Sequence, residues 1–154
     1  MRAHGFIGNR LLGFQRHHLI PVNVVQRRVF EPLFLLVSSV GFDARNFVSN
    51  GVLLPASEDA VKLTGLPLHR GPHPQYDQLV SEGLAEISSE LDRKTVGSPI
   101  VAYRRISDLQ GLLRRALSHN ETLMLNRNDP RASVSSLCKM DYDIKRISID
   151  EFLA

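Results

Sequence analysis

Two pairs of histidines stand out because imidazole side chains bind metal ions and exchange protons near neutral pH. The first pair, His17 and His18, lies in the stretch RHHLIP, and the second, His69 and His73, lies in HRGPH. Neutral imidazoles are ligands for divalent transition ions such as Zn²⁺ or Ni²⁺, and an imidazole held off the metal can take a proton from water. These are parts for phosphodiester hydrolysis. The alternative is that both pairs are solvated surface residues.

The second pair has the spacing of two ligands on one helical face, but its sequence opposes a helix. His73 stands between Pro72 and Pro74, and a residue that precedes proline is driven out of the α region. Pro74 instead suits the first position of a helix. We therefore expect a bent loop that carries His69 and His73 to a helix N-terminus, where free N–H groups favour anions such as phosphate.

The bulk composition is that of one globular domain over residues 1–154. No apolar run approaches the ~20 residues of a membrane span. The N-terminal residues lack the apolar core of a secretory signal. A single cysteine, Cys138, excludes an internal disulfide framework and a multi-cysteine zinc site. We expect no membrane-embedded part and no disulfides.

The charge distribution favours a polyanionic partner for the first half of the chain. Residues 1–73 contain eight basic and four acidic side chains, a net charge of +4, whereas residues 74–154 contain eleven basic and twelve acidic ones. Arginine outnumbers lysine by fifteen to four, which suits two-pronged contacts with phosphate. A basic surface that is merely solvated would show the same pattern, so the charge only supports the argument from the histidines.

Hydrophobic periodicity predicts the elements that must position the histidines. HHLIP is typical of a strand ended by Pro21, and NGVLLP of a strand that follows a turn. From Pro74 onward, apolar residues recur at helical spacing as far as about residue 93. The other expected elements are a helix from Asn23 to Gly41 that is kinked or split at Pro32, a turn-like stretch over 42–50, a short helix around 57–63, a helix over 106–118, and a strand or helix over 142–149.

Three motifs in this order resemble the AHH family of the HNH/endonuclease VII superfamily of nucleases. HHLIP is similar to the family's catalytic strand, NGVLLP to its asparagine strand and HRGPHPQY to its metal-binding end. The resemblance runs from Arg16 to Leu84, and Arg16 stands where the family has alanine. It implies an α+β fold, a mostly helical domain around a small ββα-metal core of the HNH, treble-clef type. That core would cover about residues 14–93, with strands at 17–20 and 51–54, and extra C-terminal helices would lie in an extension over about residues 95–154.

The resemblance also implies a role for each motif residue. His18 would be the general base, and His17, His69 and His73 would bind a divalent metal ion: Mg²⁺, Mn²⁺, Zn²⁺ or Ni²⁺. Asn50 would serve catalysis by bonding to backbone or base and holding the His18 ring in orientation. Because neighbours on a regular strand point to opposite faces, either a bulge turns His17 inward together with His18, or His17 has only a structural role.

The expected function is therefore a metal-dependent endonuclease that cuts DNA with little sequence specificity. Arg16, Arg45 and Arg70 flank the motifs and could bind phosphates. By resemblance, the domain would be the toxic effector of a bacterial antagonism system, polymorphic or type VI secreted, acting in the cytoplasm of a target cell and bound by a cognate immunity protein. The alternatives are an RNase, a non-catalytic histidine–zinc module that binds nucleic acid or protein, and a metallohydrolase of small phosphate esters.

Overall fold

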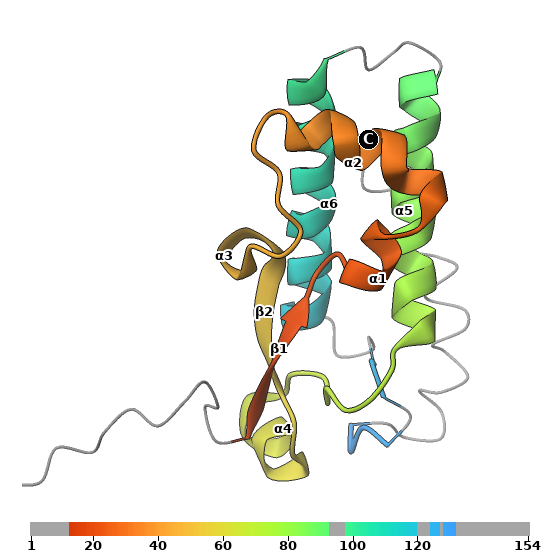
Figure 1. Ribbon diagram of the computed structural model, residues 1–154. Coiled ribbons are helices and arrows are strands. Elements are labelled where there is room, and N and C mark those ends of the chain that lie inside the picture. Colours follow the sequence, from red (N-terminus) through yellow and green to blue (C-terminus); the bar gives the residue numbers. More distant parts are fainter. Residues whose placement is uncertain (1–12, 93–97, 120–123, 127, 132–154) are drawn as a thin grey trace, which may run out of the picture.

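A small two-stranded sheet packs among helices, so the chain has the mostly helical α+β fold that the sequence predicts (Figure 1). The structure, a computed structural model, describes residues 13–92, 98–119, 124–126 and 128–131. Its elements in chain order are β1 (Phe14–His18), α1 (Val22–Val25), the 3₁₀ turn η1 (Arg28–Phe30), α2 (Glu31–Ser38), α3 (Phe47–Asn50), β2 (Gly51–Pro55), α4 (Glu58–Thr64), α5 (Pro74–Asp92) and α6 (Pro99–His119).

The first strand is displaced from its predicted position. HHLIP predicts a strand over 17–20, whereas β1 ends at His18. The next two residues leave the sheet because Asn50 binds their backbone. The Leu19 N–H donates to the Asn50 carbonyl at 2.9 Å, and the Ile20 N–H donates to the Asn50 side-chain Oδ1 at 2.9 Å. The strand therefore ends where a side chain replaces the partner strand.

The predicted helix from Asn23 is divided into three short pieces, α1, η1 and α2. The division falls before Pro32, which lies in the first turn of α2. There the missing N–H of proline breaks no helical hydrogen bond. Asn23 does not cap the helix. It lies inside α1, and its Nδ2 donates to the Asp77 carboxylate at 2.7 Å, which ties α1 to the start of α5.

The shorter helices depend on side-chain caps. Ser57 accepts a hydrogen bond from the Ala60 N–H and starts α4, as the sequence predicts. The stretch 42–50 is not wholly turn-like, since Asn46 accepts from the Val48 N–H and starts the single turn of α3. That turn places the Asn50 side chain at the end of β1 and leads directly into β2.

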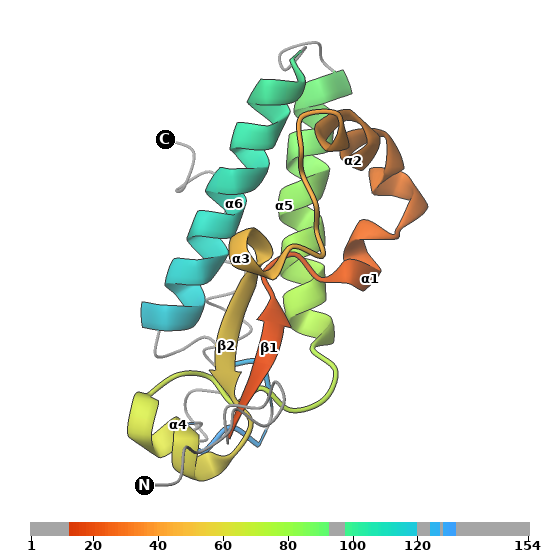
Figure 2. The same cartoon turned by 60° about the vertical axis from the view of Figure 1, so that its left-hand side comes forward.

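The two long helices, α5 and α6, run side by side, and α2 packs across them (Figures 1 and 2). Helix α5 begins at Pro74 as predicted, but α6 begins at Pro99, seven residues before the predicted start. Its buried Ile106, Leu113 and Leu117 belong to the same hydrophobic core as the residues of α2 and α5. Within the described ranges, no helix is both long and apolar enough to cross a membrane. The predicted element over 142–149 lies outside the described residues.

Gly51, at the join between α3 and β2, provides a test of this packing. A Cβ at this position would collide with the Phe47 ring and with the Phe47 carbonyl oxygen. We expect Gly51→Ala to lower the free energy of unfolding by about 1–3 kcal/mol, as overpacking does. Gly111→Ala in α6 is the matched control, because its Cβ would meet only the Arg115 guanidinium at an ordinary 3.6 Å, so it should raise stability by about 0.5–1 kcal/mol. Urea denaturation measures both, and equal effects would contradict the proposed collision.

Candidate metal and catalytic site

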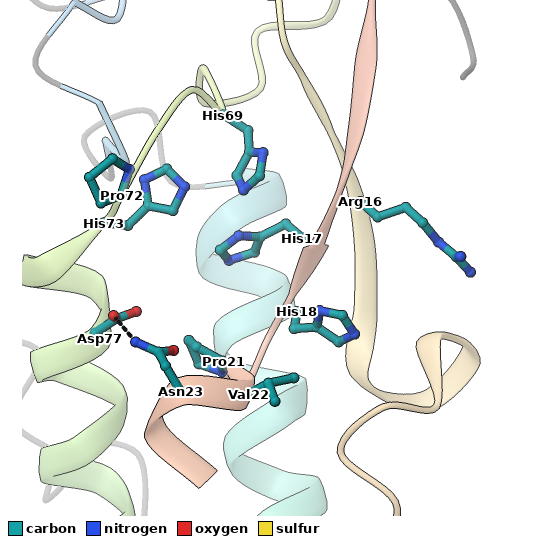
Figure 3. Close-up of a pocket in the computed structure, with 10 residues that line it drawn as sticks. All are labelled: Arg16, His17, His18, Pro21, Val22, Asn23, His69, Pro72, His73 and Asp77. Atoms are coloured by element: carbon teal, nitrogen blue, oxygen red, sulfur yellow. Dashed lines mark hydrogen bonds between the residues drawn. The ribbon is translucent and has the colours of Figure 1, made fainter. Parts of the chain in front are cut away.

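Three histidines from two separate segments converge beside β1. His17 comes from the strand, and His69 and His73 come from the loop between α4 and α5. One nitrogen of each ring lies within 4.8 Å of the others. The ring centroids are 4.9 Å apart for His17 and His69, 5.7 Å for His17 and His73, and 4.6 Å for His69 and His73. Figure 3 shows the three rings pointing toward one another. This arrangement can hold one metal ion by three nitrogen ligands.

His17 reaches the cluster on a strand without a bulge. The ladder pairs Arg16 with Leu53, His17 with Val52 and His18 with Gly51, one residue to one. Alternation along the strand then buries His17, which is 4 % exposed, and directs the half-buried His18 to the other side, away from the cluster (Figure 3). Because they are neighbours on a regular strand, the two histidines point to opposite sides of β1. No bulge is needed to bring His17 to the cluster, and His17 need not be limited to a structural role.

Burial keeps two of the three clustered histidines, His17 and His69, neutral at physiological pH. The pKa of His17 is lowered to about 3, mainly because burial penalises the charged ring and further because His69, His73 and His18 would repel it. The pKa of His69 is lowered to about 4 by burial first and by His73 second. Because only a neutral imidazole has a lone pair to give, these two rings are ready to bind a metal ion at neutral pH.

Hydrogen bonds from outside the cluster orient two of the rings. His69 Nδ1 lies 3.1 Å from Gln15 Oε1, and His73 Nδ1 lies 3.0 Å from the Leu125 carbonyl oxygen. Both partners are acceptors, so in a neutral ring these bonds favour the proton on Nδ1 and leave the lone pair on Nε2. The buried His17 Nε2 and His73 Nε2 have no hydrogen-bond partner among the described residues. A metal ion would satisfy these nitrogens, so the residues present fit the group that the sequence implies.

Sequence reasoning missed both of these orienting groups. Gln15 lies two residues before His17, so it shares a face of β1 with that ligand, and the period of two could have found it. Leu125 acts through its carbonyl oxygen, which gives no signal in the side-chain pattern. Tyr76 is 3 % exposed, packs in a T-shaped arrangement against His17 and donates to the Leu19 carbonyl at 2.7 Å.

Asn50 binds the backbone, and its side chain does not hold the His18 ring. The amide is fully buried, and its Nδ2 donates to the carbonyls of Ile20 and Ala44 at 2.9 and 2.7 Å. Its Oδ1 accepts from the Ile20 N–H at 2.9 Å and from Gln110 Nε2 at 3.0 Å. These four bonds use the whole capacity of the amide. Asn50 therefore acts on His18 only by fixing where β1 ends.

The histidines line a cavity of about 340 Å³, and the predicted phosphate-binding arginines differ in their relation to it. Arg16 lines the cavity, but its guanidinium lies 4.1 Å from the centre of the Phe47 ring and points away from the cluster (Figure 3). Arg45 and Arg70 are exposed and are not among the lining residues. His18 also lines the cavity, so the cavity joins the three-histidine cluster to the fourth imidazole.

Comparison with known families shows which family the chain that forms this site belongs to. Residues 8–109, more than half of the chain, match the model of AHH, a nuclease family of the HNH/ENDO VII superfamily with conserved AHH. The chain belongs to this family. No curated protein and no solved structure matches it. The Ala-His-His signature here reads Arg16-His17-His18, and the exposed position of Arg16 explains why a larger side chain fits.

The lowered pKa of His17 predicts an acid-sensitive fold in the absence of metal. As the pH falls below 6.5, the unfolded chain takes up a proton on His17, whereas the folded protein does not until about pH 3. Acid therefore favours the unfolded state, and His17 alone should remove about 2 kcal/mol of stability between pH 7 and pH 5. Chemical denaturation in EDTA at the two pH values measures this loss. His17→Leu should reduce the loss, and His18→Gln, which keeps the cluster intact, should not; equal losses in all three proteins would refute the assignment.

Proposed function

We propose that this protein is a metal-dependent endonuclease that hydrolyses phosphodiester bonds in DNA with little sequence specificity. One observation carries the proposal: three imidazoles converge on one side of β1, and a fourth, His18, lines the same cavity from the other side. This is the division of labour between ligands and base that metal-assisted hydrolysis needs. Membership of a nuclease family supports the reaction class.

In this mechanism, His17, His69 and His73 would hold the metal ion. When bound, a divalent ion supplies Lewis-acid stabilisation of the charge that develops on the phosphate. His18 takes the proton from the attacking water on an imidazole nitrogen. The water oxygen forms a bond to phosphorus as the bond from phosphorus to the leaving sugar oxygen breaks. The described part of the chain offers the His18 ring no hydrogen bond, so its nitrogens are available for this transfer.

An extended polyanion fits this cavity better than a small phosphate ester does. Exposed residues from three segments, Arg16, Asn23 and Pro72, stand on its wall, so it opens at the surface. Arg16, on the cavity wall, would bind a phosphate of the strand, and the exposed Arg45 and Arg70 would bind the flanking backbone. The net charge of +4 over residues 1–73 supports attraction to nucleic acid. DNA is proposed over RNA because the superfamily mostly cuts DNA.

Plasmid cleavage and metal binding together test the assignment of roles. The wild type is incubated with supercoiled plasmid in Mg²⁺, Mn²⁺, Ni²⁺ or Zn²⁺ or in EDTA, and calorimetry measures the Kd of each metal. We expect His18→Ala to bind metal as the wild type does but to cleave about 10²–10⁴-fold more slowly, the usual contribution of a general base. His73→Ala should lose both metal binding and cleavage. Arg28→Ala, an exposed arginine outside the cavity, is the control and should retain both.

The outcomes separate the proposal from its rivals. Cleavage by His18→Ala at the wild-type rate would refute the assignment of His18 as the general base. Cleavage of RNA alone would make the protein an RNase. Tight metal binding with no cleavage of either polymer would favour a histidine–zinc module that only binds its partner.

We propose further that the domain is the toxic effector of a bacterial antagonism system, that it acts in the cytoplasm of a target cell, and that a small acidic immunity protein covers its basic half. The resemblance over Arg16 to Leu84 and the +4 charge support this role. Expression of the wild type in bacterial cytoplasm should abolish growth, and co-expression of the product of the neighbouring gene should restore it. Growth of cells with the wild type equal to growth with His18→Ala would overturn the toxin role.

A further inference from the structure

Two of the three ligand histidines lie on a segment that has no regular secondary structure. Residues 65–73 connect α4 to α5 and carry both His69 and His73. Two bonds to the sheet restrain this loop, both at His69: its N–H donates to the Pro55 carbonyl at 2.7 Å, and its Nδ1 lies 3.1 Å from Gln15 Oε1. Loops are more mobile than the elements that they connect, and a metal site needs ligands held close to their final geometry. The loop therefore requires further restraint.

A segment far along the chain, beyond α6, supplies that restraint. Three groups of this segment bind three points of the loop: the Leu125 carbonyl accepts from His73 Nδ1, Asn126 Nδ2 donates to the carbonyl of residue 70, and Asp129 Oδ2 accepts from the Leu68 N–H at 2.8 Å. Two of the bonds are made by the residues on either side of His69, and the third is made by the His73 ring itself.

Asp129 is the strongest of these contacts because its carboxylate is buried with its partners. The residue is 2 % exposed, and its oxygens also accept from the Arg131 backbone N–H at 3.0 Å and pair with the Arg131 guanidinium at 2.9 Å. Burial would raise the pKa of Asp129, but the bonds from Arg131 and from the Leu68 N–H outweigh burial and lower it. Arg131 also donates to the Gly65 carbonyl at 2.9 Å, at the other end of the loop. A buried carboxylate bound in this way resists displacement.

We propose that Leu125, Asn126, Asp129 and Arg131 form a latch that sets the metal affinity of the histidine site, with Asp129 as its positioning residue. The latch fixes the backbone on which His69 and His73 stand, and its Leu125 carbonyl holds the His73 proton on Nδ1 so that Nε2 faces the cluster. It lies beyond the residues that match the family, 8–109. This inference rests on the proposed metal-binding function of the same site.

Asp129→Asn tests the latch with two readouts. The asparagine keeps an acceptor for the Leu68 N–H but loses the charge that binds Arg131. We expect the Kd for Ni²⁺ or Zn²⁺, measured by calorimetry, to rise about 10–100-fold, as happens when groups that orient metal ligands are changed. In the metal-free protein, the ¹⁵N chemical shifts of His73 should change from one tautomer, protonated on Nδ1, to a mixture of two.

Glu90→Gln is the matched control, because it breaks another arginine–carboxylate pair, that of Glu90 with Arg105 between α5 and α6. Glu90 stands about 25 Å along α5 from His73 at the helical rise per residue. Glu90→Gln should lower the free energy of unfolding without changing the metal Kd or the His73 tautomer. A similar rise in Kd for Glu90→Gln would show that general loss of stability, not the latch, weakens the site.

Each remaining result decides the proposal. Wild-type Kd and a single His73 tautomer in folded Asp129→Asn would overturn the latch and leave the proposed nuclease function standing. If the wild type binds no metal, the proposed function fails, whereas the tautomer of metal-free His73 still tests the latch. If Asp129→Asn does not fold, Asn126→Ala takes its place; it removes the bond to the carbonyl of residue 70 and the bond from the Asn128 N–H, and an unchanged Kd would overturn the proposal.

Discussion

The buried amide of Asn50 is the contact on which the rest of the site depends. Its four hydrogen bonds join Ile20, two residues after the end of β1, to the loop before α3 and to helix α6, and all four are shielded from water. Leaving such a group without partners costs about 1–3 kcal/mol for each missing bond, so the three segments are held in one arrangement. Helix α6 adds a second tie, because Arg114 donates to the carbonyls of Gly51 and Ser49. A helix that begins beyond the predicted core thus fixes the strands within that core.

Once the end of β1 is fixed, the pleat of the strand directs two adjacent histidines to opposite sides. His17 turns inward, where burial keeps it neutral, and the half-buried His18 lines the cavity from the other side. A ligand must keep its lone pair in a low-dielectric site, whereas a base must exchange a proton with a water molecule. In the proposed mechanism, these neighbouring positions on a regular strand would meet both needs.

The cluster also carries a cost that a metal ion would relieve. Three ring nitrogens lie close together, and the buried Nε2 atoms of His17 and His73 lack hydrogen-bond partners in the described structure. The fold holds this unfavourable grouping with contacts from outside: Gln15 on β1, the Tyr76 ring against His17, and the segment after α6. In the proposed metal site, affinity would therefore depend on the packing of these outside segments against the histidine rings.

The sequence by itself determined the fold class, the helix that begins at Pro74, the bent loop before it, and the motifs that mark a nuclease family. These follow from local rules: proline geometry, hydrophobic period and motif order. Only the tertiary structure decided that β1 ends at His18 and that the Asn50 side chain binds backbone in place of the His18 ring. It also decided that Asp129 binds the loop over residues 65–73, which carries His69 and His73. Those outcomes depend on hydrogen bonds between residues 30 to 61 positions apart, which leave no period in the chain because a side-chain or carbonyl acceptor is specified by position in space.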